Sequence, residues 1–170
     1  MNEELKKKLY DTGFNNECTY GGCSQGVLGS VKDNLGHVTD ETFTAATALA
    51  AGVAASGNTC GACTGAILSL GSFLGRDYAN FGTPEGIENK NRATAIGRKL
   101  LAKFDEEYGS CKCSEIQQKI YGKSYRMYIP EEKAEFIACG GHGPNGCTKV
   151  VGNAAVWVGE ILEEEGLLDK

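Results

Sequence analysis

Eight cysteines are the residues of this 170-residue chain with the clearest capacity for chemistry. They form four pairs along the sequence: Cys18 and Cys23, Cys60 and Cys63, Cys111 and Cys113, Cys139 and Cys147. Each pair lies in or beside a segment that contains glycine, which permits sharp turns and lets the main chain approach a bulky group closely. Because a chain of this length does not need disulfides in order to fold, the pattern indicates metal or redox chemistry.

Three of these cysteines, Cys60, Cys113 and Cys147, stand where helices are predicted to begin. Unpaired N–H groups and the positive end of the helix dipole favour negative charge there, which lowers the pKa of a thiol. The same N–H groups can donate hydrogen bonds to the sulfurs of an iron–sulfur cluster. We therefore expect several helix starts to converge on one pocket suited to an anionic, thiolate-ligated cluster.

The helices that must position these thiols are indicated by apolar residues that recur at helical spacing, while the strands of an α/β protein are missing. Helices are predicted over residues 3–11, 20–34, 39–55, 60–75, 83–108 and 145–165, with short ones after residue 113 and from residue 130. Thr83-Pro84-Glu85 is a strong start signal for the longest helix, and Gly109 ends it. The sequence thus predicts one all-α domain over residues 1–170, an irregular helical bundle with cysteine-bearing loops at helix N-termini.

Four sequence blocks follow one another in a characteristic order. They are Cys23-Ser24-Gln25-Gly26-Val27-Leu28, the stretch from Thr59 to Ala66, the stretch from Phe104 to Ile116, and Cys147-Thr148-Lys149-Val150-Val151. In this order they resemble the redox-active protein family named for its C_GCAxxG_C_C cysteine pattern, which is similar in turn to the non-haem part of split-Soret cytochromes. The resemblance implies a helical fold, an iron–sulfur centre and a homodimer.

The resemblance also implies a ligand set. Carried over position by position, it makes the cluster ligands Cys23, Cys60, Cys113 and Cys147. The central motif departs from the family pattern, because Cys60 precedes Gly61 where the family has glycine first. The remaining cysteines would provide a second cluster, enlarge one cluster or serve as alternative ligands: Cys18, Cys63, Cys111 and Cys139.

The cofactor expected on these thiols is a [4Fe–4S] cluster as first choice and a [2Fe–2S] cluster as second, because four thiolates suit either. Haem is not expected, since covalent attachment needs Cys-x-x-Cys-His and Thr64 follows Cys63. Two alternatives stay open: a structural or storage zinc module on the same cysteines, and a thiol redox sensor formed by Cys60 and Cys63. His142, among glycines between two cysteines, is a candidate hydrogen-bond partner or occasional ligand.

The composition of the chain and the motifs it lacks exclude several classes of function. Its net charge is -5 and its basic residues are scattered, so nucleic-acid binding is not expected. The acidic start lacks the apolar core of a secretory signal, and no apolar run approaches the roughly 20 residues that span a bilayer. No catalytic triad or phosphate-binding loop is found, which favours an electron-transfer protein over an enzyme. We expect a cytoplasmic one-electron carrier whose redox partner protein the sequence does not identify.

Overall fold

The computed structural model describes residues 1–168, and over that range it is all-α, with eight α-helices and no β-strand. The longer helices are α1 (Glu3–Tyr20), α2 (Cys23–Leu35), α4 (Gly61–Leu74), α5 (Pro84–Tyr108) and α8 (Cys147–Glu164). The shorter elements are α3 (Asp40–Ala45), η1 (Thr47–Leu49), η2 (Tyr78–Asn80), α6 (Cys113–Tyr121) and α7 (Pro130–Ala138). The predicted fold class is confirmed. Within the described residues, no helix has both the length and the apolar character that crossing a membrane requires.

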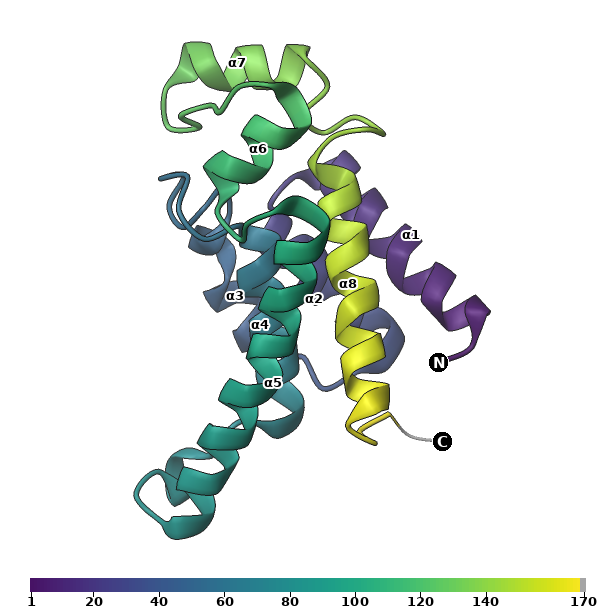
Figure 1. The fold of residues 1–170 in the computed structure, drawn as a ribbon, viewed down its shortest axis with the longest axis vertical. Coiled ribbons are helices and arrows are strands. Elements are labelled where there is room, and N and C mark those ends of the chain that lie inside the picture. The colour runs from purple at the N-terminus through teal and green to yellow at the C-terminus, as the bar shows by residue number, and fades with distance from the viewer. Residues whose placement is uncertain (169–170) are drawn as a thin grey trace.

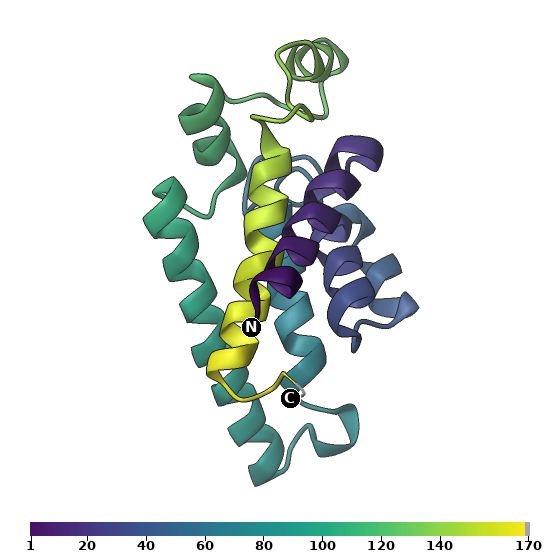
Figure 2. The ribbon, with the colours of Figure 1, turned by 90° about the vertical axis from the view of Figure 1, so that its right-hand side faces the viewer.

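Helix α8 is the centre of the bundle and contacts α1, α2, α4 and α5 (Figures 1 and 2). Its buried side includes Val150, Ala154, Val158 and Ile161, which recur at the three- to four-residue spacing of a helix face. Glycine lets α1 approach closely, since a Cβ atom at Gly152 would lie only 2.8 Å from the ring of Tyr10. The bundle is therefore held by an apolar stripe and by glycines that admit neighbouring side chains.

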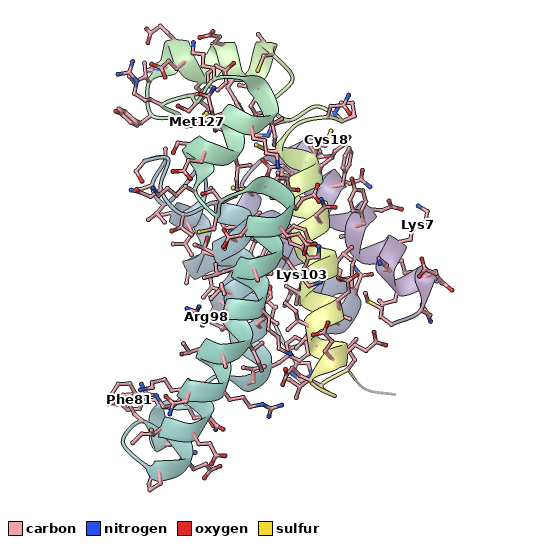
Figure 3. The ribbon with its side chains drawn as sticks, in the orientation of Figure 1. Lys7, Cys18, Phe81, Arg98, Lys103 and Met127 are labelled. Carbon is pink, nitrogen blue, oxygen red and sulfur yellow. The ribbon has the colours of Figure 1, made fainter. Side chains whose placement is uncertain are left out.

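Helix α5 begins and ends where the sequence predicts. The hydroxyl of Thr83 accepts a hydrogen bond from the Gly86 N–H at 3.1 Å, and Gly109 closes the helix with a φ of 79°. The N-terminal part of α5 extends beyond the bundle at one end of the molecule, where Figure 3 labels Phe81. Cys18 and Met127 are labelled at the opposite end, where α6 and α7 lie.

The first helix is longer than predicted, because α1 continues to Tyr20 rather than ending at residue 11. Its second half is polar and carries Gly13, which lowers helix propensity and hides the pattern. Packing against α8 overrides that weakness: a Cβ atom at Gly13 would lie 3.3 Å from the Cβ of Ala155. The chain then turns at two glycines with φ of 66° and 83°, so α2 begins at Cys23 instead of Tyr20.

The third predicted helix, over residues 39–55, is wrong beyond Ala45. The Thr39 hydroxyl caps α3 as expected, accepting from the Thr42 N–H at 3.2 Å, but the chain then forms η1 and a left-handed turn. In that turn, positive φ values of 51–64° occur at Ala51, Val53, Ala54 and Ala55. Such a conformation costs a non-glycine residue about 1–2 kcal/mol. The high helix propensity of alanine is therefore overridden by the tertiary structure, in which this turn forms one wall of a cavity.

Candidate redox site

Four helices begin at one cavity of about 600 Å³. Cys60 is the N-cap of α4, and the first residues of α2, α6 and α8 are Cys23, Cys113 and Cys147. All four side chains line the cavity. The sequence predicted three of these helix starts and placed Cys23 inside a helix. The structure brings it to an N-terminus as well, so the four ligand candidates share both a location and a local environment.

Cys60 and Cys113 are buried, Cys23 and Cys147 are half-buried, and all four line the same cavity. Burial is the main cause that raises the pKa of Cys60 and Cys147 to about 12. It also raises the pKa of Cys23 and Cys113 well above the ordinary thiol value. Neighbouring thiols add to the effect, since the pKa of Cys23 is raised by Cys60 and that of Cys60 by Cys147. The thiols therefore stay protonated at neutral pH unless a bound metal displaces their protons.

Backbone N–H groups oppose the effect of burial at two of the sulfurs. The N–H groups of Ser24 and Ala51 donate hydrogen bonds to the sulfur of Cys23 and lower its pKa. Two N–H groups in the first turn of α4 do the same for Cys60. Ala51 belongs to the left-handed turn. This strained segment therefore lines the cavity and also donates a backbone hydrogen bond to the Cys23 sulfur. These donors favour the thiolate form, as a metal or cluster ligand requires.

The motif Cys60-Gly61-Ala62-x-x-Gly65 has a steric explanation. A Cβ atom at Gly61 would overlap the sulfur of Cys23, and one at Gly65 would collide with the backbone of Ser24. The two glycines therefore let the start of α4 lie directly against the start of α2. Cys60 and Cys23 become neighbours for this reason, although they are 37 positions apart in the sequence.

Tyr121 is a site residue that sequence reasoning missed as a cysteine partner. Its hydroxyl accepts a hydrogen bond from the Cys147 N–H at 2.9 Å. The single hydrogen of that hydroxyl is within reach of two acceptors, the Gly141 carbonyl at 3.1 Å and the Cys147 sulfur at 3.4 Å. The hydroxyl of Tyr125 lies equally far from the sulfur of Cys139. No sequence pattern connects these residues, because the contact depends on how α6 and the segment before α8 pack.

A buried acidic residue, Glu17, lines the same cavity and was also missed. Its Oε1 atom lies 3.1 Å from Nδ1 of His142, the histidine that the sequence suggested as a hydrogen-bond partner. Its Oε2 atom is, among residues 1–168, the one buried side-chain nitrogen or oxygen without a hydrogen-bond partner. The burial of Glu17 could have been predicted from its spacing, since it follows Leu9 and Gly13 at every fourth residue on the buried side of α1.

The four other cysteines do not share one location. Cys18 lines the cavity from the end of α1, although it is largely exposed. Cys63, Cys111 and Cys139 do not line it. Burial raises the pKa of Cys63 to about 12, and the neighbouring Cys111 contributes. Within the described part of the chain no disulfide joins any cysteine, and no three His, Cys, Asp or Glu side chains are grouped to hold one metal ion.

Fold and cavity together define an all-α protein with four of its eight thiols gathered at helix N-termini. The model of the family described as "Putative redox-active protein (C_GCAxxG_C_C)" matches residues 22–161, and the chain belongs to that family. The resemblance drawn from the sequence is thereby confirmed, and with it a redox role. A search of curated proteins and a search of solved structures each found no match.

Proposed function

We propose that this protein binds an iron–sulfur cluster on Cys23, Cys60, Cys113 and Cys147 and transfers single electrons through it. The observation that carries the proposal is the convergence of four helix N-termini, each bearing a cysteine, on one cavity. Each terminus directs partial positive charge toward the place where an anionic cluster would lie. Membership of a redox-active family supports the same chemistry.

The chemistry of the cavity favours a cluster over a single ion. A zinc–sulfur bond of about 2.3 Å would require the four sulfurs to lie within about 4 Å of one another. Among residues 1–168, no three His, Cys, Asp or Glu side chains lie close enough together to hold one such ion. A redox sensor made from Cys60 and Cys63 has less support, because Cys60 lines the cavity and Cys63 does not. A [4Fe–4S] cluster remains our first choice and [2Fe–2S] our second.

The chain supplies three things to this function. The backbone donors on Cys23 and Cys60 stabilise added negative charge and so favour reduction. Apolar side chains such as Ile116 and Val151 line the cavity and limit the access of water. Tyr121 holds Cys147 through its hydroxyl. When bound, the cluster would supply reversible one-electron chemistry, exchanged with a partner protein.

Two further expectations accompany the proposal and remain predictions. The family resemblance implies a homodimer, which light scattering of the purified protein would detect as twice the mass of the 18.0 kDa chain. The second expectation is a cytoplasmic location, where reducing conditions keep thiols free to bind metal. Fractionation of cells that produce the protein from its own promoter would test it.

The experiment that tests the proposal is anaerobic purification followed by visible spectroscopy and iron and sulfide analysis. We expect brown protein with about four irons and four sulfides per chain, or about two of each for the second choice. Serine replacement of any one of Cys23, Cys60, Cys113 or Cys147 should remove most of the iron. The matched controls are Cys63→Ser and Cys139→Ser, which change the same group outside the cavity.

Three results would count against the proposal. Colourless protein with stoichiometric zinc would favour the zinc module. Metal-free protein with a reversible Cys60–Cys63 disulfide would favour the thiol sensor. Equal loss of iron from the Cys63→Ser and Cys139→Ser controls would show that the ligand set is wrong.

A further inference from the structure

A carboxylate lies among the four thiols without the partner that its burial requires. Glu17, in the last turn of α1, is 3% exposed and lines the cysteine cavity. Its Oε1 atom pairs with Nδ1 of His142 at 3.1 Å, while Oε2 has no hydrogen-bond partner. Whether Glu17 is charged or protonated, a shielded carboxyl oxygen with no partner is unfavourable.

The orphaned oxygen is not typical of this molecule. The other buried hydroxyls are paired, for example Ser24 with the carbonyl of Ala46 at 2.9 Å and Ser30 with that of Leu9 at 2.7 Å. Buried polar atoms in folded proteins are hydrogen-bonded almost without exception. An exception beside a cysteine-lined cavity indicates that the missing partner is a group the chain does not itself supply.

The position of Glu17 connects this partner with the thiols. After burial and the neighbouring thiols, the charge of Glu17 is a further cause that raises the pKa of Cys23 and Cys113. Glu17 acts in the same way on Cys147. One carboxylate thus lies within electrostatic range of three of the four proposed ligands. Glu17 also lines the same cavity as the four thiols, so a metal held there would share that cavity with the carboxylate.

We propose that Oε2 of Glu17 is an additional, fifth ligand to one cysteine-bound iron of the centre, while His142 holds the carboxylate through Oε1. The inference rests on the proposed function, since it adds a ligand to the same site. Carboxylate oxygen is an ordinary ligand for iron, and metal-bound carboxylates are usually hydrogen-bonded by a second residue. His142 is a positioning residue here, and its ring packs edge-on against Phe136 at 5.3 Å between centroids.

The consequence is that one iron differs from the others. An iron bound partly by oxygen has a larger Mössbauer isomer shift than one bound by sulfur alone, because oxygen donates less electron density. Protein labelled with ⁵⁷Fe and purified without oxygen should therefore show a minor component of larger isomer shift. In Glu17→Gln this component should disappear or merge with the all-sulfur signal. The matched control is Glu3→Gln, the same change at an exposed position of the same helix, and it should leave the spectrum unchanged.

The positioning role of His142 has its own readout. In His142→Ala the oxygen-ligated component should broaden or shift while the iron content stays near that of the unmodified protein. The unmodified protein decides the main point even if the variants fold poorly. A spectrum with only sulfur-ligated iron would overturn this inference and leave the proposed function standing. Absence of iron and sulfide from the unmodified protein would overturn both.

Discussion

Two regions of the molecule differ in how their buried groups find partners (Figures 1 and 3). One is the helical bundle around α8, and the other is the cysteine cavity, at the end of the molecule where Cys18 and Met127 are labelled. In the bundle, buried apolar side chains meet glycines and one another, as Leu9 meets Gly159. In the cavity, the lining includes four thiols, an unpartnered carboxylate oxygen and a left-handed turn. The bundle satisfies its buried polar groups internally, whereas the cavity contains a carboxylate oxygen, Oε2 of Glu17, that no group within residues 1–168 satisfies.

This difference implies that the stability of the two regions depends on a cofactor to different extents. Interactions within the bundle contribute to folding whether or not a cofactor is present. Under the proposed function, the buried thiols and the left-handed turn of the cavity would gain stability from the bound cluster. The two regions should therefore respond differently to the same kinds of change.

The largest effect is expected from a substitution that breaks the bundle. Gly65→Val should destabilise the protein by more than about 3 kcal/mol, because the new side chain would collide with the backbone of Ser24 where α4 meets α2. Urea unfolding followed by circular dichroism measures the change. The control on the same helix is Gly71→Ala, whose Cβ atom meets nothing within 4 Å and should stabilise by about 0.5–1 kcal/mol. Equal effects would show that α2 and α4 do not touch as described.

Removal of the cofactor should separate the two regions. In chelated, reduced protein we expect amide hydrogen exchange to rise at least about tenfold in residues 46–60 and 113–147. The middle of α8, which includes Ala154 and Val158, should keep its protection because apolar packing alone holds it. Uniform loss of protection over the whole chain would mean that the bundle also depends on the cofactor.

A smaller change should damage the cavity and spare the bundle. Gly61→Ala improves the helix propensity of α4, but its methyl group would overlap the sulfur of Cys23. We expect the iron content to fall by about half or more, since a displacement of about 1 Å is enough to spoil such a site. The stability of the metal-free protein should change by less than about 1 kcal/mol. Gly71→Ala is again the control and should retain its iron.

The smallest effect is expected from the loss of one hydroxyl group. Tyr121→Phe removes a hydroxyl that lies within donor range of the Cys147 sulfur and of the Gly141 carbonyl. In the proposed site, a hydrogen bond from this hydroxyl to the sulfur would stabilise the more negative, reduced state of the cluster. A hydrogen bond worth about 0.5–1.5 kcal/mol corresponds to a fall in reduction potential of roughly 20–60 mV. Potentiometric titration measures it. Tyr125→Phe, which removes a contact with Cys139 instead, should leave the potential within error. A shift of the same size in both variants would contradict this assignment.

Sequence reasoning succeeded where the signal is local. The start of α5 at Thr83 and Pro84 and its end at Gly109 depend on hydrogen bonds and backbone angles within a few residues. The apolar stripe of α8 predicted its buried face for the same reason. Failures occurred where a distant segment overrode local preference. Helix α1 extends because α8 packs on Gly13, and residues 51–55 turn left-handed although alanine favours a right-handed helix.

For the candidate site, the sequence predicted the thiols but not the groups that surround them. The family resemblance named the four cysteines, and the helical spacing of apolar residues placed three of them at predicted helix starts. The burial of Glu17 could have been predicted from the spacing of buried residues on α1. The absence of a hydrogen-bond partner for Oε2 could not, since a missing contact has no sequence pattern. The contact of Tyr121 with Cys147 joins residues 26 positions apart and depends on how their helices are placed.

The sequence by itself determined that the chain is helical, where its cysteines lie along it and which family it belongs to. These properties follow from short-range hydrogen bonding, helix capping and residue order. Only the tertiary structure decided that four helix starts share one cavity and that a carboxylate lies among their thiols without a partner. The physical reason is that such meetings are set by the packing of whole helices, in which glycines such as Gly61 and Gly65 control the approach.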